Sequence, residues 1–496
     1  MTPSLTSQST SADPPSTGGA GAAERRPEPE PSLTAVILAA GQGTRMRSRH
    51  HKVLHPLAGR PLISRVLALV RGAGARPVVV VLGHLADQVR AVLPPDVSTV
   101  AQEPQRGTGH AVQVAAGRLR AAGAQRLLVH LGDTALVRPE SLAALVAAPI
   151  GPQAPVALLT ARLADPRGYG RVIRGPDGTV LAMVEEIEAT PEQRSVDEVW
   201  SGSMLLWSEW LWDRLFHLPE HSGGEYYLTD LVNLAREEGR AVKAVLAADE
   251  DEVRGVNDRA QLAVANAIVR QRTIAAHQAA GVTVVDPATT YIEPEVQIAA
   301  DVTVQPGCHL QGASRIDADA EIGPNTMLAD AHVGERSRVW WSVLEGARVG
   351  RDVKVGPFSH LRPGAVVEDG AVVGNYAEVK ASRIGPGTQV HHFSYLGDAD
   401  VGASVNVGAG TITCNYNAET GAKSRTVVED GAALGSDTML IAPVTVGANG
   451  MTGAGAIVTR DIGPDEVWVG APARRVRKRT GPRRRATPPA TAKGPE

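Results

Sequence analysis

Cysteine is nearly absent from this chain, since only Cys308 and Cys414 occur among 496 residues. Two cysteines cannot build a disulfide framework, nor can they supply a four-ligand zinc site by themselves. Long apolar runs are also missing, because none approaches the roughly 18 residues that a membrane helix needs. Residues 1–31 lack the apolar core of a signal peptide. These absences predict a cytoplasmic protein with no membrane span.

Aromatic residues make up only 3% of the chain, whereas glycine (52) and proline (34) are frequent. Glycine does not recur at every third position, which excludes a collagen-like fibre. Hydrophobic residues (43%) are numerous enough for the cores of two or three globular domains. The turns of these domains are therefore expected to be unusually frequent.

The net charge of −3 hides a basic C-terminus, because residues 474–496 carry nine basic groups and one acid. Such a segment could contact nucleic acid, but no aromatic residues lie among its charges, and we interpret it as a solvated tail. The sequence predicts disorder for residues 474–496 and for the Ser-, Pro- and Glu-rich residues 1–31. It predicts no specific nucleic-acid partner.

Residues 32–256 alternate between strand-like and helical patterns. The apolar runs lie at 34–40, 77–82, 126–131 and 156–161, and the helical patterns lie at 62–70 and 110–119. This alternation is typical of a doubly wound α/β sheet, whose ligands bind at the carboxyl ends of the strands. Residues 257–290 are predicted to form a helical linker.

Aliphatic residues recur at every sixth position within residues 291–473. One series comprises Ile298, Val304, Leu310, Ile316, Ile322 and Leu328, and another runs from Val349 to Val379. A period of six fits neither a strand nor a helix. It suits a coil that turns a corner every six residues and points one apolar side chain per face inward. The pattern resembles the hexapeptide repeat of left-handed parallel β-helices, which we predict here.

A glycine-rich loop follows the first predicted strand. It reads Leu38-Ala39-Ala40-Gly41-Gln42-Gly43-Thr44-Arg45-Met46, and Lys52 lies six residues beyond it. The backbone amides of such a loop can approach a polyphosphate, and Arg45 and Lys52 could neutralise its charge. Met46 stands where a Rossmann fingerprint needs Gly, and the Gly-Lys-Ser/Thr of a P-loop is missing. Taken alone, the loop could also be a tight turn with basic surface residues.

Further motifs accompany the loop. They are Gln102 with Gly107-Thr108-Gly109-His110, then Gly132-Asp133, Gly168-Tyr169-Gly170-Arg171, Glu185, Gly224-Glu225-Tyr226-Tyr227-Leu228-Thr229-Asp230 and Gly255-Val256-Asn257. Together these motifs resemble the sugar-phosphate nucleotidylyltransferases. These motifs are followed in the chain by the six-residue repeat of residues 291–473, which we call the hexad domain. With both parts, the chain resembles the bifunctional family that acetylates glucosamine 1-phosphate and then uridylylates the product.

The resemblance implies synthesis of UDP-N-acetylglucosamine for the cell envelope from acetyl-coenzyme A and UTP. It implies that Asp133 and Asn257 bind Mg²⁺, although Asp133 alone could be a helix N-cap. Arg45 and Lys52 are the implied catalytic cations. The residues implied to bind UTP or the UDP-sugar are Leu38, Ala39, Gly41, Lys52, Gln102, Gly107, Thr108, Gly170, Glu185, Tyr227, Thr229 and Asn257.

In the hexad domain the resemblance implies that His392 is the general base of acetyl transfer. The implied contacts to glucosamine phosphate are Arg362, Lys380, Tyr395, Asn406 and Lys423, and those to acetyl-coenzyme A are Ala409, Asn415, Tyr416, Ser436 and Ala454. Members of this family associate as homotrimers, which the resemblance implies here as well.

Two departures from the family pattern affect the first domain. Trp200 stands where the family has an Asn that contacts the sugar, and Thr134-Ala135 replaces Val-Pro. An indole cannot supply the hydrogen-bond acceptor of a carboxamide. Two alternatives to the bifunctional enzyme therefore stay open. In the first, only the acetyltransferase is competent and the nucleotidyltransferase is impaired or altered in specificity. In the second, the chain is a silent trimeric scaffold.

Overall fold

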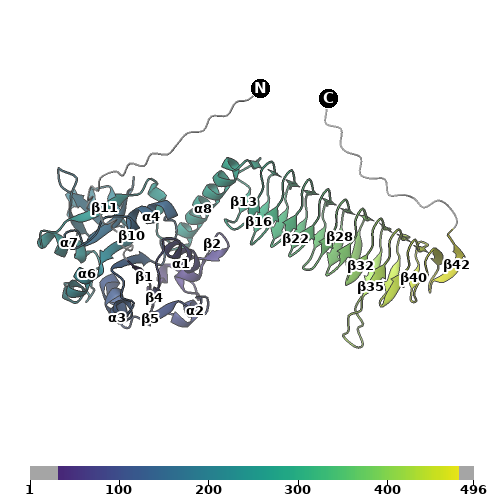
Figure 1. Cartoon of the computed structure of the whole chain (residues 1–496), viewed down its shortest axis with the longest axis horizontal. Coiled ribbons are helices and arrows are strands. Elements are labelled where there is room, and N and C mark those ends of the chain that lie inside the picture. The colour runs from purple at the N-terminus through teal and green to yellow at the C-terminus, as the bar shows by residue number, and fades with distance from the viewer. Residues whose placement is uncertain (1–31, 480–496) are drawn as a thin grey trace, which may run out of the picture.

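Residues 32–479 are described by the computed structural model, in which an α/β domain is joined through one helix to an elongated coil (Figure 1). The predicted disorder of residues 1–31 and 480–496 lies outside the described residues. None of the helices within 32–479 combines the length and the apolar character that a membrane crossing requires.

A mixed nine-stranded sheet forms the centre of the α/β domain. Its main strands follow the order β11-β7-β10-β6-β1-β4-β5, while β8 pairs with β10 and β9. Strand β1 is parallel to β4 and β6, whereas β10 is antiparallel to β6 and β7. The strands are β1 (Leu33–Ala39), β4 (Val78–Leu82), β5 (Ser98–Ala101), β6 (Arg126–Leu131), β7 (Val156–Arg162), β8 (Arg171–Arg174), β9 (Val180–Val184), β10 (Glu198–Trp207) and β11 (Val242–Leu246).

Helices cover both faces of this sheet, which confirms the doubly wound prediction. Apolar residues of α1, α4 and α8 pack on one face, and those of α3, α6 and α7 pack on the other. The helices are α1 (Leu62–Gly72), α2 (Ala86–Arg90), α3 (Gly107–Ala121), α4 (Pro139–Val146), α5 (Pro191–Arg194), α6 (Ser208–Arg214), α7 (Asp230–Glu237) and α8 (Arg259–Ala279). Short elements are β2 (Pro56–Leu57), β3 (Arg60–Pro61), and the 3-10 turns η1 (Thr44–Met46), η2 (Lys52–Leu54), η3 (Leu215–His217) and η4 (Glu250–Val253).

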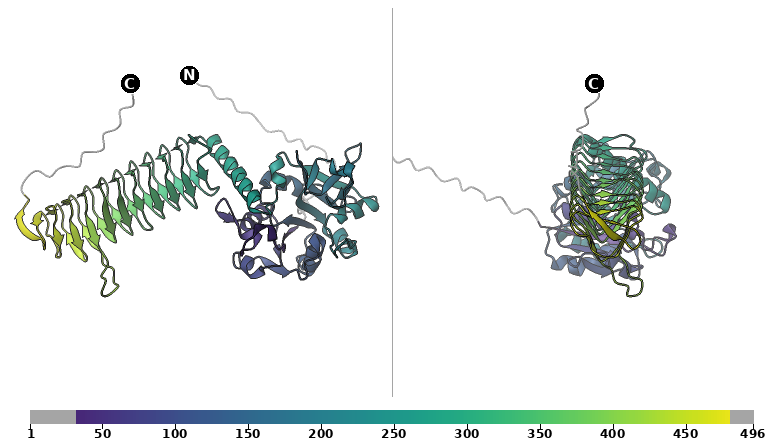
Figure 2. Two further views of the ribbon diagram at one scale, coloured as in Figure 1. Left: turned by 180° about the vertical axis from the view of Figure 1, so that it is seen from behind. Right: turned by 90° about the vertical axis from the view of Figure 1, so that its right-hand side faces the viewer.

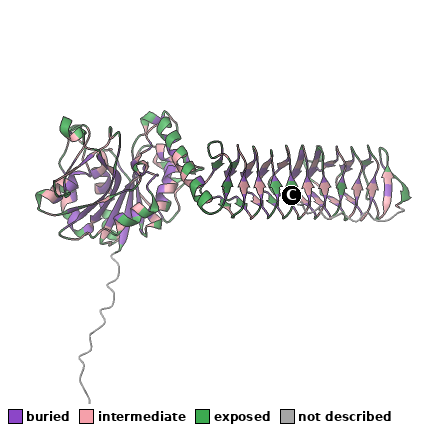
Figure 3. Ribbon diagram, turned by 90° about the horizontal axis from the view of Figure 1, so that it is seen from above, coloured by how far each residue is buried: buried purple, intermediate pink, exposed green. Residues whose placement is uncertain are grey.

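The hexad domain is a left-handed coil of three flat parallel sheets, as the six-residue period predicts (Figure 2). Each strand is short, and its repeat residue points into the core. Val304, for example, is fully buried and pairs with Ile322, which lies 18 positions later and is also fully buried. The coil therefore encloses a continuous column of aliphatic side chains, which is seen as buried segments along its length in Figure 3.

The strands of the coil are given sheet by sheet. The first sheet contains β12 (Thr283–Val284), β15 (Thr303–Val304), β18 (Glu321–Ile322), β21 (Arg338–Val339), β24 (Lys354–Val355), β27 (Val372–Val373), β30 (Gln389–Val390), β33 (Asn406–Val407), β36 (Ala433–Leu434), β39 (Met451–Thr452), β41 (Glu466–Val469) and β42 (Arg474–Lys478). The second contains β13 (Tyr291–Ile292), β16 (His309–Gln311), β19 (Met327–Ala329), β22 (Val343–Glu345), β25 (His360–Leu361), β28 (Ala377–Lys380), β31 (Ser394–Gly397), β34 (Ile412–Cys414), β37 (Met439–Ile441) and β40 (Ile457–Val458). The third contains β14 (Gln297–Ile298), β17 (Arg315–Ile316), β20 (His332–Val333), β23 (Arg348–Val349), β26 (Val366–Val367), β29 (Arg383–Ile384), β32 (Ala399–Val401), β35 (Thr426–Val428) and β38 (Val444–Val446).

Both ends of the coil differ from the sequence prediction. At its start, β12 lies inside the segment 257–290 that was predicted as linker, and Ile274 of α8 packs into the coil core. At its end, the prediction of disorder is wrong for residues 474–478, which form β42 antiparallel to β41. Backbone pairing with an open sheet edge does not depend on side-chain polarity, so charged residues can still form this strand.

One turn of the coil is longer than the others. Ala399 pairs with Thr426, which lies 27 positions later, whereas the other turns repeat after 16 to 20 positions. The extra residues form a loop after β34, which projects from the coil in Figure 1. Tyr416 and Lys423 form a backbone bridge at the base of this loop.

Candidate active sites

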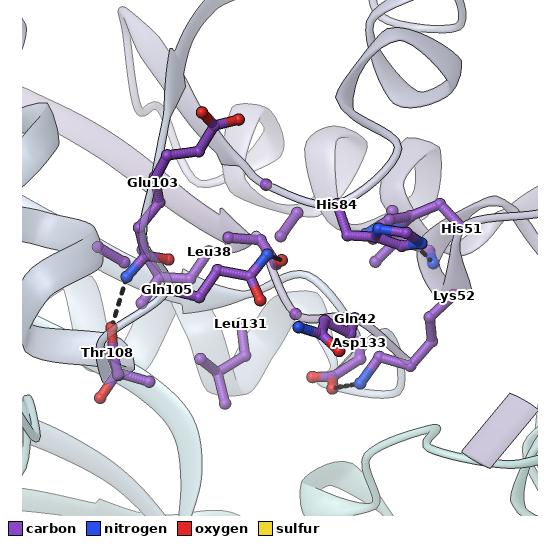
Figure 4. A pocket seen from close by; sticks show the side chains of 18 of the residues that line it. Leu38, Gln42, His51, Lys52, His84, Glu103, Gln105, Thr108, Leu131 and Asp133 are labelled. Atoms are coloured by element: carbon purple, nitrogen blue, oxygen red, sulfur yellow. Dashed lines mark hydrogen bonds and ion pairs between the residues drawn. The ribbon is translucent and has the colours of Figure 1, made fainter. Parts of the chain in front are cut away.

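A cavity of about 890 Å³ opens at the carboxyl ends of β1, β4, β5 and β6 (Figure 4). This is the edge at which a doubly wound sheet binds ligands. Predicted residues that line the cavity are Leu38, Ala39, Gly41, Lys52, Gln102, Gly107, Thr108 and Asp133. The structure therefore gathers most of the predicted nucleotide contacts around one space.

The loop after β1 depends on glycine at position 43. Gly43 has a φ of 61°, and a Cβ there would lie 2.8 Å from the Cβ of Lys52. A side chain would thus be strained and would collide with Lys52. The 3-10 turn η2 begins at Lys52 and is capped by His51, whose Nδ1 accepts a hydrogen bond from the amide of Val53 at 3.2 Å. Close approach of the loop to η2 fixes the position at which Lys52 enters the cavity.

Lys52 joins the two predicted metal ligands. Its Nζ forms an ion pair with Asp133 Oδ2 and donates a hydrogen bond to Asn257 Oδ1 at 3.1 Å. The amide of Val256 donates to the carbonyl of Asp133 at 3.1 Å, which holds the two segments together. The two oxygens therefore converge on a single cationic group, and a carboxylate and an amide oxygen suit a hard cation such as Mg²⁺. Within residues 32–479 no group of three or more His, Cys, Asp or Glu could hold a metal.

The far side of the cavity is ordered by hydrogen bonds around the start of α3. Gln102 is buried, and its Nε2 donates to the carbonyl of Gly107 at 2.9 Å. Thr108 Oγ1 accepts from the amide of Leu228 at 3.0 Å. Gly107 has a φ of 85°, and a Cβ there would lie 2.6 Å from the carbonyl oxygen of Tyr226. These contacts hold Gln102 and Thr108 at the rim, where a planar base could be read.

A second group of predicted residues lies beside the cavity. Thr229 Oγ1 donates to Glu185 Oε1 at 3.0 Å, and a Cβ at Gly170 would lie 3.4 Å from Glu185 Oε2. Burial raises the pKa of Glu185. Burial and a hydrogen bond to Glu225 raise the pKa of Tyr227 to about 12. Trp200 adjoins this group, because its amide donates to the carbonyl of Gly170 at 3.4 Å.

One predicted catalytic residue does not reach the cavity. Arg45 lies in η1, is exposed, and does not belong to the cavity lining. His51, His84 and Gln105 are among the lining residues that were not predicted. His84 and Gln105 lie two and four residues after the ends of β4 and β5, and this position in the loops that follow parallel strands was the signal that could have identified them.

The predicted anion contacts of the hexad domain occupy neighbouring turns of one sheet. Arg362 follows β25, Lys380 ends β28 and Tyr395 lies in β31. Arg362 is paired with Glu378 at 2.8 Å. Lys423 of the projecting loop lies against Lys380, and this cation, with a smaller effect from Arg362, lowers the pKa of Lys380. The long loop therefore adds a fourth predicted residue to a cationic cluster that suits a phosphate.

His392 lies at the corner between the first and second sheets, two residues before β31, and is exposed. The predicted coenzyme A contacts follow at the same corner in later turns: the amide of Asp437 donates to Ala409 at 2.6 Å, and that of Gly455 donates to Ser436 at 2.8 Å. Ala454 directly precedes Gly455.

The remaining predicted residues of the acetyl site lie on either side of this corner. Asn406 lies on β33 of the first sheet, around the corner from the cationic cluster. Asn415 Nδ2 donates a hydrogen bond to Asp398 Oδ2 at 2.5 Å. Tyr416 begins the projecting loop and is 60% exposed.

Comparison with known proteins agrees with this two-part architecture. The family described as MobA-like NTP transferase domain matches residues 35–236, and the bacterial transferase hexapeptide family (six repeats) matches residues 346–381. The bifunctional protein GlmU of Trichlorobacter lovleyi is 44% identical over 439 residues, covering 88% of this chain and 95% of the relative. GlmU of Brevibacillus brevis is 41% identical, with 90% and 96% covered, and GlmU of Mycolicibacterium vanbaalenii is 43% identical, with 90% and 93% covered.

Proposed function

This chain belongs to the family of bifunctional GlmU proteins, which make UDP-N-acetylglucosamine by two successive group transfers, and we propose that its two sites carry one transfer each. Similarity over nearly the whole chain favours this reading over an acetyltransferase with an impaired partner domain or a silent scaffold. The observation that carries the assignment of the first site is the convergence of Lys52, Asp133 and Asn257 at the end of the sheet.

In the coil, the amine of glucosamine 1-phosphate attacks the thioester carbonyl of acetyl-coenzyme A and releases the thiol. His392 takes the proton of the attacking amine. Arg362, Lys380, Tyr395, Asn406 and Lys423 bind the sugar phosphate, and Ala409, Asn415, Tyr416, Ser436 and Ala454 line the path of coenzyme A. The position of His392 at the corner beside the cationic cluster supports this role.

In the α/β domain, a phosphate oxygen of N-acetylglucosamine 1-phosphate attacks the α-phosphorus of UTP, and pyrophosphate leaves. Leu38, Ala39 and Gly41 bring backbone groups to the nucleotide, Gln102, Gly107 and Thr108 read the uracil, and Lys52 neutralises phosphate charge. Gly170, Glu185, Tyr227 and Thr229 hold the sugar. Asp133 and Asn257 would bind Mg²⁺, which supplies charge neutralisation on the phosphates. Because Arg45 is exposed and outside the cavity lining, its catalytic role requires its side chain to turn toward the ligand.

We test this function by two assays on the same protein. Acetyl-coenzyme A should be consumed with glucosamine 1-phosphate, and pyrophosphate should be released from UTP with N-acetylglucosamine 1-phosphate. Removing divalent cations with a chelator should abolish only pyrophosphate release, and Mg²⁺ should restore it. Pyrophosphate release that persists in excess chelator would contradict the metal assignment, and acetyl transfer serves as the internal control.

A homotrimer is supported by a row of exposed aromatic residues along the corner that leads to His392. Trp341, Phe358, Tyr376 and Phe393 lie in consecutive turns and are 43%, 49%, 63% and 57% exposed. The ring centroid of Phe358 lies 5.8 Å from that of Trp341 and 5.3 Å from that of Tyr376. Soluble proteins rarely leave such a row uncovered. A second copy of the chain would cover it and complete the acetyl site.

Replacing both Phe358 and Tyr376 by Asp should therefore dissociate the assembly and reduce acetyl transfer by at least about tenfold, since charged groups disfavour burial at an interface. Pyrophosphate release should persist, because its cavity lies in the other domain. Light scattering after size-exclusion chromatography measures the mass. Phe216→Asp, which changes an exposed aromatic residue of the α/β domain, is the matched control. An unchanged mass for the double variant would show that the aromatic row is not part of the interface between subunits.

The free thiols of Cys308 and Cys414 suit a reducing compartment, and we place the enzyme in the cytoplasm. Burial raises the pKa of Cys308 to about 11, which makes that thiol a poor nucleophile.

A further inference from the structure

Strand β10 is distorted where it carries Trp200. Its pairing with β7 shifts register between Trp200 and Met204, and Gly202 in this bulge has a φ of 83°. A Cβ at Gly202 would lie 2.7 Å from Leu131 Cδ1. Bulges of this kind re-aim a side chain at a site. Here the bulge sets Trp200 next to Gly170 and the Glu185–Thr229 pair.

The indole is fixed in this position by its own strand. Nε1 of Trp200 donates to the carbonyl of Ser203 at 2.8 Å. Ser203 Oγ in turn lies 2.8 Å from Nδ1 of His130, and both residues are fully buried. Because its one polar atom is used within the protein, Trp200 offers a ligand only the carbon surface of its ring.

The indole packs against the apolar cluster that also supplies cavity-lining residues such as Leu38 and Ala111. Leu131 lines the cavity and packs in the same apolar cluster as Trp200 and Met183. Trp200 is neither buried nor fully exposed, so part of the ring remains accessible. Trp200 is not itself part of the cavity lining, but its contact with Gly170 places it beside the polar group of Glu185, Tyr227 and Thr229.

We propose that Trp200 is a specificity-determining residue of the uridylyl site, where its indole packs against the C–H surface of the sugar phosphate in place of a hydrogen-bonding side chain. This inference rests on the proposed function of the cavity. A pyranose has polar edges and an apolar face, so Glu185 and Thr229 are suited to its hydroxyl groups and Trp200 to its carbon face. Recognition of the sugar should therefore depend on an aromatic ring at position 200 and not on its N–H group.

The test compares Trp200→Ala, Trp200→Phe and Trp200→Asn with the wild type in pyrophosphate release. Trp200→Ala should raise KM for N-acetylglucosamine 1-phosphate about tenfold, while KM for UTP stays within about twofold. Trp200→Phe keeps a ring and should stay within about threefold of the wild type. Trp207→Phe is the matched control, since Trp207 lies at the opposite end of β10 and pairs with Arg126.

Three results would overturn the proposal: an unchanged sugar KM in Trp200→Ala, a parallel change in the KM for UTP, or a lower sugar KM in Trp200→Asn. If Trp200→Ala does not fold, fluorescence titration with UDP-N-acetylglucosamine decides the question. Quenching should occur in the wild type and Trp207→Phe and disappear in Trp200→Phe; quenching retained in Trp200→Phe would also overturn it. A wild type that releases no pyrophosphate would refute the uridylyl function itself, whereas a working wild type with unaffected variants refutes only the role of Trp200.

Discussion

Asp133→Ala is expected to lower pyrophosphate release by about 10³-fold or more and to leave acetyl transfer within about twofold of the wild type. The substitution removes one of the two oxygens that converge on Lys52 Nζ. It thereby removes a proposed Mg²⁺ ligand and also the carboxylate that positions Lys52. Both losses act on the charge that develops as pyrophosphate leaves, so they act on kcat more than on substrate binding.

Two further variants separate these effects. Asp133→Asn keeps an oxygen but removes the charge, and it should retain more activity at high Mg²⁺ concentration than Asp133→Ala does. Asp177→Ala removes an exposed carboxylate from the same domain and should be neutral. If Asp133→Ala released pyrophosphate at the wild-type rate, neither the metal role nor the positioning role of Asp133 could stand. Loss of both activities would instead indicate misfolding, which thermal unfolding measures.

His392→Ala should have the converse effect, with acetyl transfer lowered about 10²- to 10⁴-fold and pyrophosphate release unchanged. The amine of the sugar must lose a proton on acylation, and His392 is the base that we propose at the corner beside Arg362, Lys380 and Tyr395. The measurement is the initial rate of thiol release from acetyl-coenzyme A at saturating substrates.

The chain offers a close control for this variant. His391 directly precedes His392, is also exposed, and has its ring centroid 6.2 Å from that of His392. His391→Ala should retain acetyl transfer. Equal losses in the two variants would mean that the corner as a whole, and not a specific base, is required. An active His392→Ala would assign proton removal to another group.

The coil was predictable from sequence because its period is set by local geometry: every face of each turn needs one inward aliphatic side chain, as Val304 and Ile322 show. Departures from the period were not predictable in the same way. The loop that separates Ala399 from Thr426 leaves the core positions intact and only lengthens one connection. Strand β42 escaped prediction because it is stabilised by backbone pairing with β41, which its basic side chains do not reveal.

The individual residues of the nucleotide site were predictable from sequence, but their arrangement in space was not. The loop after β1 and the strand ends identified Lys52 and Asp133, yet these residues are 81 positions apart, and only the fold brings them together. Arg45 belongs to the same loop but is exposed, because the loop turns through η1 before it returns at Lys52. For Trp200, the sequence revealed the substitution, whereas the bulge of β10 and the bond to Ser203 explain how the chain accommodates an indole there.

The two ends of the coil have a consequence for how separate molecules meet. A stack of parallel strands has an open edge at each end, and unprotected edges allow chains to add to one another as growing fibres. Helix α8 covers the first turn with Ile274. At the other end the longest sheet finishes in β42, whose five residues are all exposed and include Arg474, Arg477 and Lys478. Two molecules approaching end to end would bring these like charges together, so the basic strand that closes the coil also discourages polymerisation.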